Sequence, residues 1–145
     1  MAMSRNIDQL NSYLRGEISA VETYRQALGK VKDPSVKAQL VECEKSHESR
    51  VDVLKQRIQQ LGGSPATGSG PWGAFAKVVQ AGADIAGDRA AVAALERGED
   101  HGLDDYRRDI DKLDPETRNL IENDLLPAAQ RTHDTVSMIE KSMKK

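Results

Sequence analysis

Two residues whose side chains could bind a metal ion or move a proton, Glu44 and His47, lie one helical turn apart. They fall on a stripe whose steps alternate between three and four residues, which is the spacing of a buried helix seam. The stripe consists of Leu40, Glu44, His47, Val51, Leu54, Ile58 and Leu61. Ionisable groups in such a seam are costly unless something pairs with them. The stretch therefore indicates a site.

Four further polar residues fall at matching places on other predicted helices. They are Glu17, Glu99, Gln130 and His133, and the last two repeat the one-turn spacing of Glu44 and His47. Carboxylates that face one another in an empty site repel and take up protons, which predicts raised pKa values. A divalent cation removes that conflict, and imidazole with carboxylate oxygens suits iron, manganese or zinc. The predicted metal ligands are Glu17, Glu44, His47, Glu99, Gln130 and His133.

The elements that must position these residues are predicted to be four helices in two hairpins. The hairpins span about 5–61 and 88–143, and Asp33-Pro34 and Asp114-Pro115 mark their corners. Aspartate is a good N-cap, and proline suits the first turn of a helix. Pro127 is predicted to remove one hydrogen bond from the fourth helix and to bend it.

The segment between the hairpins, residues 62–87, is predicted to be a long crossover. Its first part is rich in glycine, serine and proline, which cannot hold a regular element. A short helix is expected from Ala74 to Ile85, and Trp72 is expected to anchor the loop. Residues 1–145 together are predicted to form one all-α, four-helix-bundle domain.

The two halves of the chain also resemble each other in sequence. Residues 15–25 match residues 97–107 without a gap, 82 positions later, with Arg-Gly-Glu at the start and Tyr-Arg at the end. The polar residue in each seam is again a carboxylate, Glu17 in one half and Glu99 in the other. This repetition predicts two hairpins packed with pseudo-twofold symmetry.

Composition excludes several other classes of protein. Only 38% of residues are hydrophobic and 3% aromatic, while 30% are charged, which suits helices with solvated outer faces better than a β-sandwich. A net charge of −2 provides no basic field for nucleic acid or anionic lipid. Cys43 is the only cysteine, and no long apolar run or signal peptide is apparent. These features predict a cytoplasmic protein.

The arrangement of ligands looks like that of the ferritin-like di-iron carboxylate bundles. The whole chain more closely resembles a bacterial ferritin-like group of unknown function. The shared features are the Asp-Pro corner, the Leu-Gly-Gly-Ser-Pro linker at 61–65, the Trp-Gly crossover, the Gly-Glu-Asp of residues 98–100 and the His-Asp of residues 133–134. The resemblance implies that Tyr24 and Tyr106 each hydrogen-bond a metal-ligating glutamate of the other half.

One departure from the di-iron pattern concerns the number of carboxylates. Gln130 stands where that pattern has a glutamate. Three carboxylates instead of four leave two divalent cations under-neutralised by one charge. The amide of Gln130 can still offer its carbonyl oxygen, but this is a weaker ligand. This departure favours a single or labile metal ion.

Two functions remain open at this stage. The first is an iron-handling or oxidase-like protein with metal between the hairpins, with manganese or zinc as other candidate ions. The second is a non-enzymatic helical module that forms homodimers or binds a partner, in which Glu44 and His47 form a buried pair without metal. His133, near a helix end, is either a ligand or a structural residue.

Overall fold

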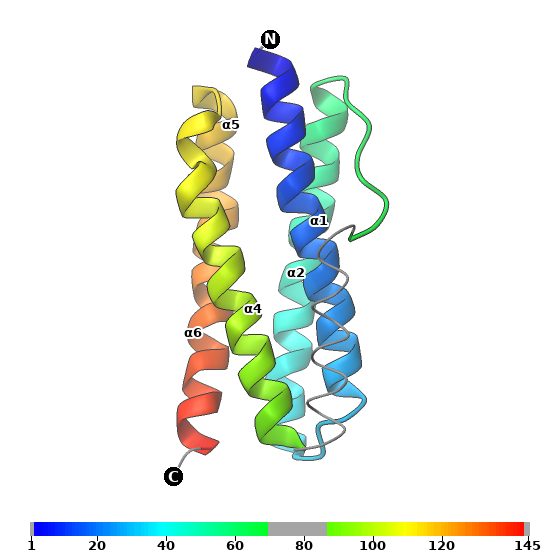
Figure 1. The fold of residues 1–145 in the computed structure, drawn as a ribbon, viewed down its shortest axis with the longest axis vertical. Helices are drawn as coiled ribbons and strands as arrows, with labels where there is room; N and C mark the ends of the chain where they lie inside the picture. Colours follow the sequence, from blue (N-terminus) through cyan, green and yellow to red (C-terminus); the bar gives the residue numbers. More distant parts are fainter. Residues whose placement is uncertain (1, 70–86, 144–145) are drawn as a thin grey trace.

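The computed structural model describes residues 2–69 and 87–143. Four long helical segments lie side by side along one axis (Figure 1). They are α1 (Ala2–Leu28), α2 (Pro34–Gln60), α4 (Asp88–Asp109) and α6 (Leu126–Met143). The most extensive contacts join α1 to α2 and α4 to α6, and the described residues contain no β-strand. The predicted all-α class is thereby confirmed.

The corner between α1 and α2 forms as the sequence predicts. The side chain of Asp33 accepts hydrogen bonds from the backbone N–H groups of Ser35 and Val36, and Pro34 occupies the first turn of α2. The carboxylate of Asp88, in the first turn of α4, accepts from the backbone N–H groups of Lys32 and Asp33. One aspartate therefore caps α2, and a second ties this corner to the other half of the chain.

The second corner is built in the same way, after a short 3-10 turn (Ile110–Lys112). Asp114 caps α5 (Pro115–Leu120) by accepting from the backbone N–H of Thr117. The side chain of Asn6 on α1 donates to Asp114 and accepts from its backbone N–H. Such caps stabilise a helix by about 1 kcal/mol each, and here they also hold the two hairpins together.

The end of α2 is set by two glycines, as predicted. Gly62 has a φ of 82°, a left-handed conformation that favours glycine. The backbone N–H of Gly63 donates to the carbonyl of Ile58 at 2.9 Å, which closes the last turn. A Cβ at Gly63 would lie 2.8 Å from a side-chain carbon of Ile7, so the chain leaves α2 in close contact with α1.

The fourth helical rod is not a simple bent helix. A π-helical segment (Ile121–Leu125) stands between α5 and α6, directly before Pro127. The backbone N–H of Leu126 donates to the carbonyl of Ile121, five residues back. A π-helical turn accommodates one extra residue in a helix. It therefore changes which side chains of α6 face the interior.

Two apolar clusters fill the interior, one around Tyr24, Leu40 and Val136, the other around Leu14, Leu54 and Leu125. Fully burying a leucine-sized side chain contributes about 1.5–3 kcal/mol. Buried polar residues form the candidate site, and one tyrosine of each cluster donates a hydrogen bond to it, Tyr24 to Glu99 and Tyr106 to Glu17.

Two other predictions concern the crossover and the membrane. The predicted helix from Ala74 to Ile85 and the anchoring role of Trp72 lie outside the described residues. Within the parts of the chain that are described, no helix is long and apolar enough to cross a membrane.

Candidate functional site

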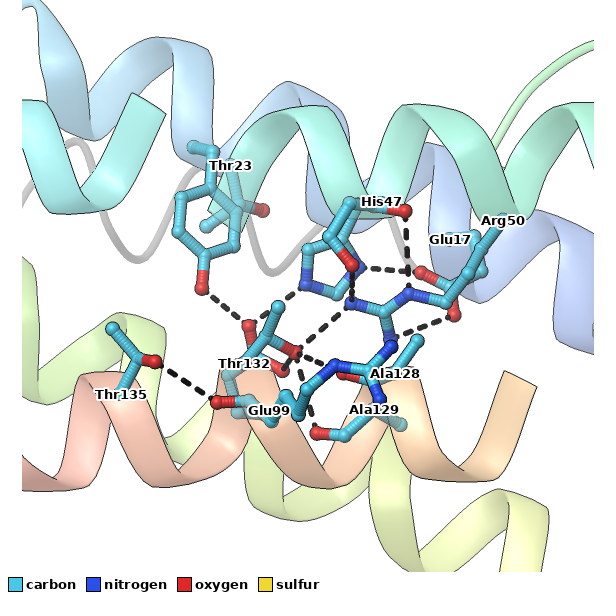
Figure 2. A network of polar contacts seen from close by, with 12 residues as sticks. Glu17, Thr23, His47, Arg50, Glu99, Ala128, Ala129, Thr132 and Thr135 are labelled. Atoms are coloured by element: carbon cyan, nitrogen blue, oxygen red, sulfur yellow. Dashed lines mark hydrogen bonds and ion pairs between the residues drawn. The ribbon is translucent and has the colours of Figure 1, made fainter. Parts of the chain in front are cut away.

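The buried polar centre is built around His47, which reaches from α2 between carboxylates of α1 and α4. Its Nδ1 lies 2.5 Å from Glu17 Oε1, and its Nε2 lies 2.7 Å from Glu99 Oε2. Figure 2 shows His47 and Arg50 pointing from α2 toward Glu17, Glu99 and Thr132. An imidazole that bonds an ionised carboxylate through each ring nitrogen carries a proton on both nitrogens.

Arg50 completes this centre, and the seam analysis did not select it. Its side chain is 3% exposed, and its Nη1 donates to Glu17 Oε2 at 3.3 Å. Its Nη2 donates to the hydroxyl of Thr132 on α6 at 2.9 Å, and that hydroxyl lies 2.8 Å from Glu99 Oε1. We call Glu17, His47, Arg50, Glu99 and Thr132 the core cluster.

The two tyrosines close the core cluster in a reciprocal manner. Tyr24 on α1 donates to Glu99 on α4, and Tyr106 on α4 donates to Glu17 on α1 at 2.6 Å. This is the exchange between halves that the resemblance implies. Burial, followed by the charge of the neighbouring glutamate, raises the pKa of both phenols, so both remain donors.

The charges of the core cluster balance one another. Burial alone would raise the pKa of Glu17, but the charges of Arg50 and His47 lower it to about 2. Burial is likewise outweighed at Glu99, where His47, Arg50 and Tyr24 lower the pKa. Burial would lower the pKa of His47, yet Glu99 and Glu17 raise it to about 9. At neutral pH two carboxylates therefore face two cations.

This balance corrects the expectation that facing carboxylates would have raised pKa values. That expectation considered repulsion between acids and omitted a buried guanidinium. Arg50 and the protonated imidazole reverse the sign of the shift, because opposite charges within a few ångströms favour ionised carboxylates. The core cluster therefore needs no metal ion to be electrically neutral.

The donors of the core cluster do not fit the two-metal centre that the ferritin resemblance implies. Such a centre takes four carboxylates and two imidazoles from the helices, whereas here two carboxylates and one imidazole converge. The cation of Arg50 is in direct contact with Glu17, so two further divalent ions would meet a site already neutralised. Ligation of metal by Glu17, His47 and Glu99 stays a prediction.

The other three predicted ligands lie away from the core cluster. Glu44 is near the surface, with its Oε1 3.9 Å from Arg25 Nε. Gln130 accepts from Arg107 at 2.6 Å and donates to Asp134 at 2.9 Å. The structure thus brings together three of the six predicted ligands and both tyrosines, with Arg50 and Thr132 added.

His133 belongs to a second polar group, on the outside of α4 and α6. Its Nε2 contacts Asp100 and lies 3.9 Å from Glu96 Oε1. One ligand atom from each of Glu96, Asp100 and His133 lies within 4.8 Å of the others. On the far side of the ring, Nδ1 is 3.3 Å from Asp134. We call Glu96, Asp100 and His133 the outer triad.

The sequence alone did not identify the two residues that were missed. The repeat has an offset of 82 positions between residues 15–25 and 97–107, but the two Asp-Pro corners are 81 positions apart, so counting from the corners relates His47 to Ala128 and Arg50 to Arg131. The one-turn pair of Gln130 and His133 is not in that register. The π-helical segment accommodates one extra residue after the second corner and restores the offset of 82. Ala129 and Thr132 then take the places of His47 and Arg50 in the second half.

Comparisons with known proteins show the family of this chain and a distant relative. A family described as a domain of unknown function (DUF2383) matches residues 5–112, and the chain belongs to that family. It is 28% identical over 109 residues to a 3-demethoxyubiquinol 3-hydroxylase of Ralstonia pickettii (strain 12J). That match covers 73% of this chain and 50% of the relative, so the chain spans about half the length of the curated relative.

Proposed function

We propose that this protein is a ferritin-like four-helix bundle that binds a single divalent metal ion at the outer triad. The observation that carries the proposal is the convergence of two carboxylates and one imidazole, from two helices, within 4.8 Å. Mixed oxygen and imidazole nitrogen donors suit zinc, manganese or iron. The metal predicted from the sequence is thereby assigned to residues outside the core cluster.

The spacing of the ligands supports the outer triad. Glu96 and Asp100 are four residues apart on α4, so they lie on one face of that helix. His133 faces them from α6, and α4 and α6 pack along their lengths. A site held by two rigid helices does not depend on a loop to bring its ligands together.

The second support is the orientation of the imidazole. A ligating histidine usually gives its other ring N–H to a carboxylate or carbonyl, which fixes the ring. Asp134 provides that partner at Nδ1, and Nε2 points to Glu96 and Asp100. Glu96 is held in turn by the hydroxyl of Ser137, 3.2 Å away.

Charge gives the third support. Glu96 and Asp100 provide two negative charges to an ion, and Asp134 adds a third beside them. The core cluster has no such surplus, because Arg50 and His47 compensate its carboxylates. A divalent cation is therefore better accommodated at the outer triad.

Metal stoichiometry tests this proposal. After incubation with Zn²⁺ or Mn²⁺ and dialysis, the wild-type chain is expected to retain about one ion, and His133→Gln is expected to lose it. His101→Gln is the matched control, because His101 is an exposed imidazole on α4 that lies near Asp105. A wild-type chain that retains less than a tenth of an ion would overturn the proposal, as would loss of the ion in Glu17→Gln with retention in His133→Gln.

The second candidate function is the non-enzymatic helical module, and the charge balance of the core cluster favours it. Every charged group there has an opposite charge in contact, so the cluster can act as a polar layer that fixes the alignment of the four helices. The activity in the name of the hydroxylase relative supports neither candidate strongly, because the chain spans only half of that protein.

A further inference from the structure

A cavity of about 60 Å³ lies between α1 and α4, beside the core cluster. A single water needs roughly 10–15 Å³ measured in this way, so there is room for several. His47 and Arg50 contribute to its lining from α2, and Tyr13 and Tyr106 contribute ring surface. The cavity thus joins apolar walls to a group of buried charges.

The internal repeat places small residues on both helices that border this cavity. Gly16 and Ala20 on α1 correspond to Gly98 and Gly102 on α4, 82 positions later, and all four line the cavity. Glycine within a helix is unfavourable. A Cβ at Gly102 would meet nothing within 4 Å, so packing does not require glycine there. There is therefore open space beside Gly102, on the α4 side of the cavity.

The hydroxyl of Tyr13 is a buried polar group beside this cavity. Tyr13 is 5% exposed, and its ring centre lies 4.6 Å from that of Tyr106. Its hydroxyl oxygen is buried and has no hydrogen-bond partner among residues 2–69 and 87–143, although Tyr13 lines the cavity. A buried polar group without a partner is destabilising. A bound molecule with a hydroxyl or carbonyl group would satisfy it.

We propose that this cavity is a binding site for an uncharged, phenol-sized molecule, whose polar group hydrogen-bonds the hydroxyl of Tyr13. The aromatic rings of Tyr13 and Tyr106 provide apolar contact for the ring of such a ligand. The ligand is uncharged because the charges of the core cluster already balance, and a further buried charge would have no partner.

Binding of three single-ring probes to the full-length protein tests this site. Phenol is expected to bind more tightly than toluene, which lacks the hydroxyl, and benzoate, which is charged, is expected to bind least. Shifts of the backbone amide signals of Gly98 and Gly102 in an NMR titration would report occupancy. Equal affinity for phenol and toluene, or no shift with any probe, would overturn the proposal.

Two variants test whether the probe binds in this cavity. Tyr13→Phe removes only the unpartnered hydroxyl, so the fold should be retained while the preference for phenol over toluene falls about two- to tenfold, the value of one hydrogen bond. Gly102→Leu adds a side chain at the cavity wall and should abolish binding. Asp104→Leu, exposed and two residues further along α4, is its control. Unchanged phenol binding in both cavity variants would overturn the site.

Discussion

The core cluster and the outer triad each contain one histidine and two carboxylates, yet only the core cluster is electrically balanced. Both pair one histidine with carboxylates from α4. In the core cluster the carboxylates also meet Arg50, and every group is nearly excluded from water. In the part of the chain that the structure describes, no guanidinium forms an ion pair with Glu96 or Asp100, and Asp100 is 55% exposed. Residue types alone thus do not define a metal site, because one buried cation changes what the acids can bind.

Removal of the Arg50 guanidinium is expected to have the largest effect on stability, and it tests whether this charge distinguishes the core cluster from the outer triad. Arg50→Met should lower the free energy of unfolding by about 3–5 kcal/mol, because Glu17 loses a buried partner. The control Arg25→Met removes an exposed guanidinium that pairs with Glu48, and should cost less than about 1 kcal/mol. Urea unfolding monitored by circular dichroism measures both. A loss below about 1 kcal/mol in Arg50→Met would show that the core cluster is not held by this charge.

The pH dependence of stability is the next largest effect. The pKa of His47 is raised from 6.5 to about 9, so its contribution is complete below about pH 6.5 and is lost as the pH rises through 9. The pKa of Glu17 is lowered from 4.5 to about 2, so its contribution is complete above pH 4.5 and is lost as the pH falls through 2. Each loss is on the order of 3 kcal/mol.

The measurement is the free energy of unfolding at pH 5.5, 7.5 and 9.5. Hydrogen bonds with Asp100 and Asp134 outweigh partial burial and raise the pKa of His133 as well, so the series belongs in a His133→Gln background. Stability should be highest at pH 5.5 and lowest at pH 9.5. Equal values at the two ends would mean that His47 is neutral in the folded protein.

The smallest effect is expected at Gln130, which the sequence offered as a ligand. Its contacts with Arg107 and Asp134 are at the surface, so Gln130→Ala should change stability by no more than about 0.5 kcal/mol. Retained metal should also be unchanged, because Gln130 is not in the outer triad. Loss of metal in Gln130→Ala would show that Gln130 contributes to the metal site and that the outer triad is not the complete set of ligands.

Much of the fold could be predicted because the signals are local. Aspartate followed by proline caps a helix wherever it occurs, and consecutive glycines end one, so both corners and the end of α2 follow from a few residues. The sequence also repeats Glu17 and Tyr24 in Glu99 and Tyr106, and the resemblance to ferritin-like bundles implies that each tyrosine bonds the glutamate of the other half. These features depend on backbone geometry or on apolar spacing, which are written into short stretches of sequence.

The face of α2 could not be predicted in the same way. Steps of three and four pass from Leu40 to His47 either through Glu44 or through Cys43, and both paths satisfy the seam. The structure buries Cys43 and Arg50. A third carboxylate at the centre would have been an uncompensated charge, whereas Arg50 and the protonated His47 together neutralise the two that are already there.

What the sequence determined by itself was therefore the set of helices, their order and the carboxylates that α1 and α4 turn inward. Only the tertiary structure decided which side of α2 and α6 meets those carboxylates. On α6 the π-helical segment before Pro127 accompanies a register in which Thr132 is buried and His133 lies outside. The physical reason is that helical spacing is a local property of the sequence, whereas the net charge of a buried site is the sum of the charges that all four helices bring together.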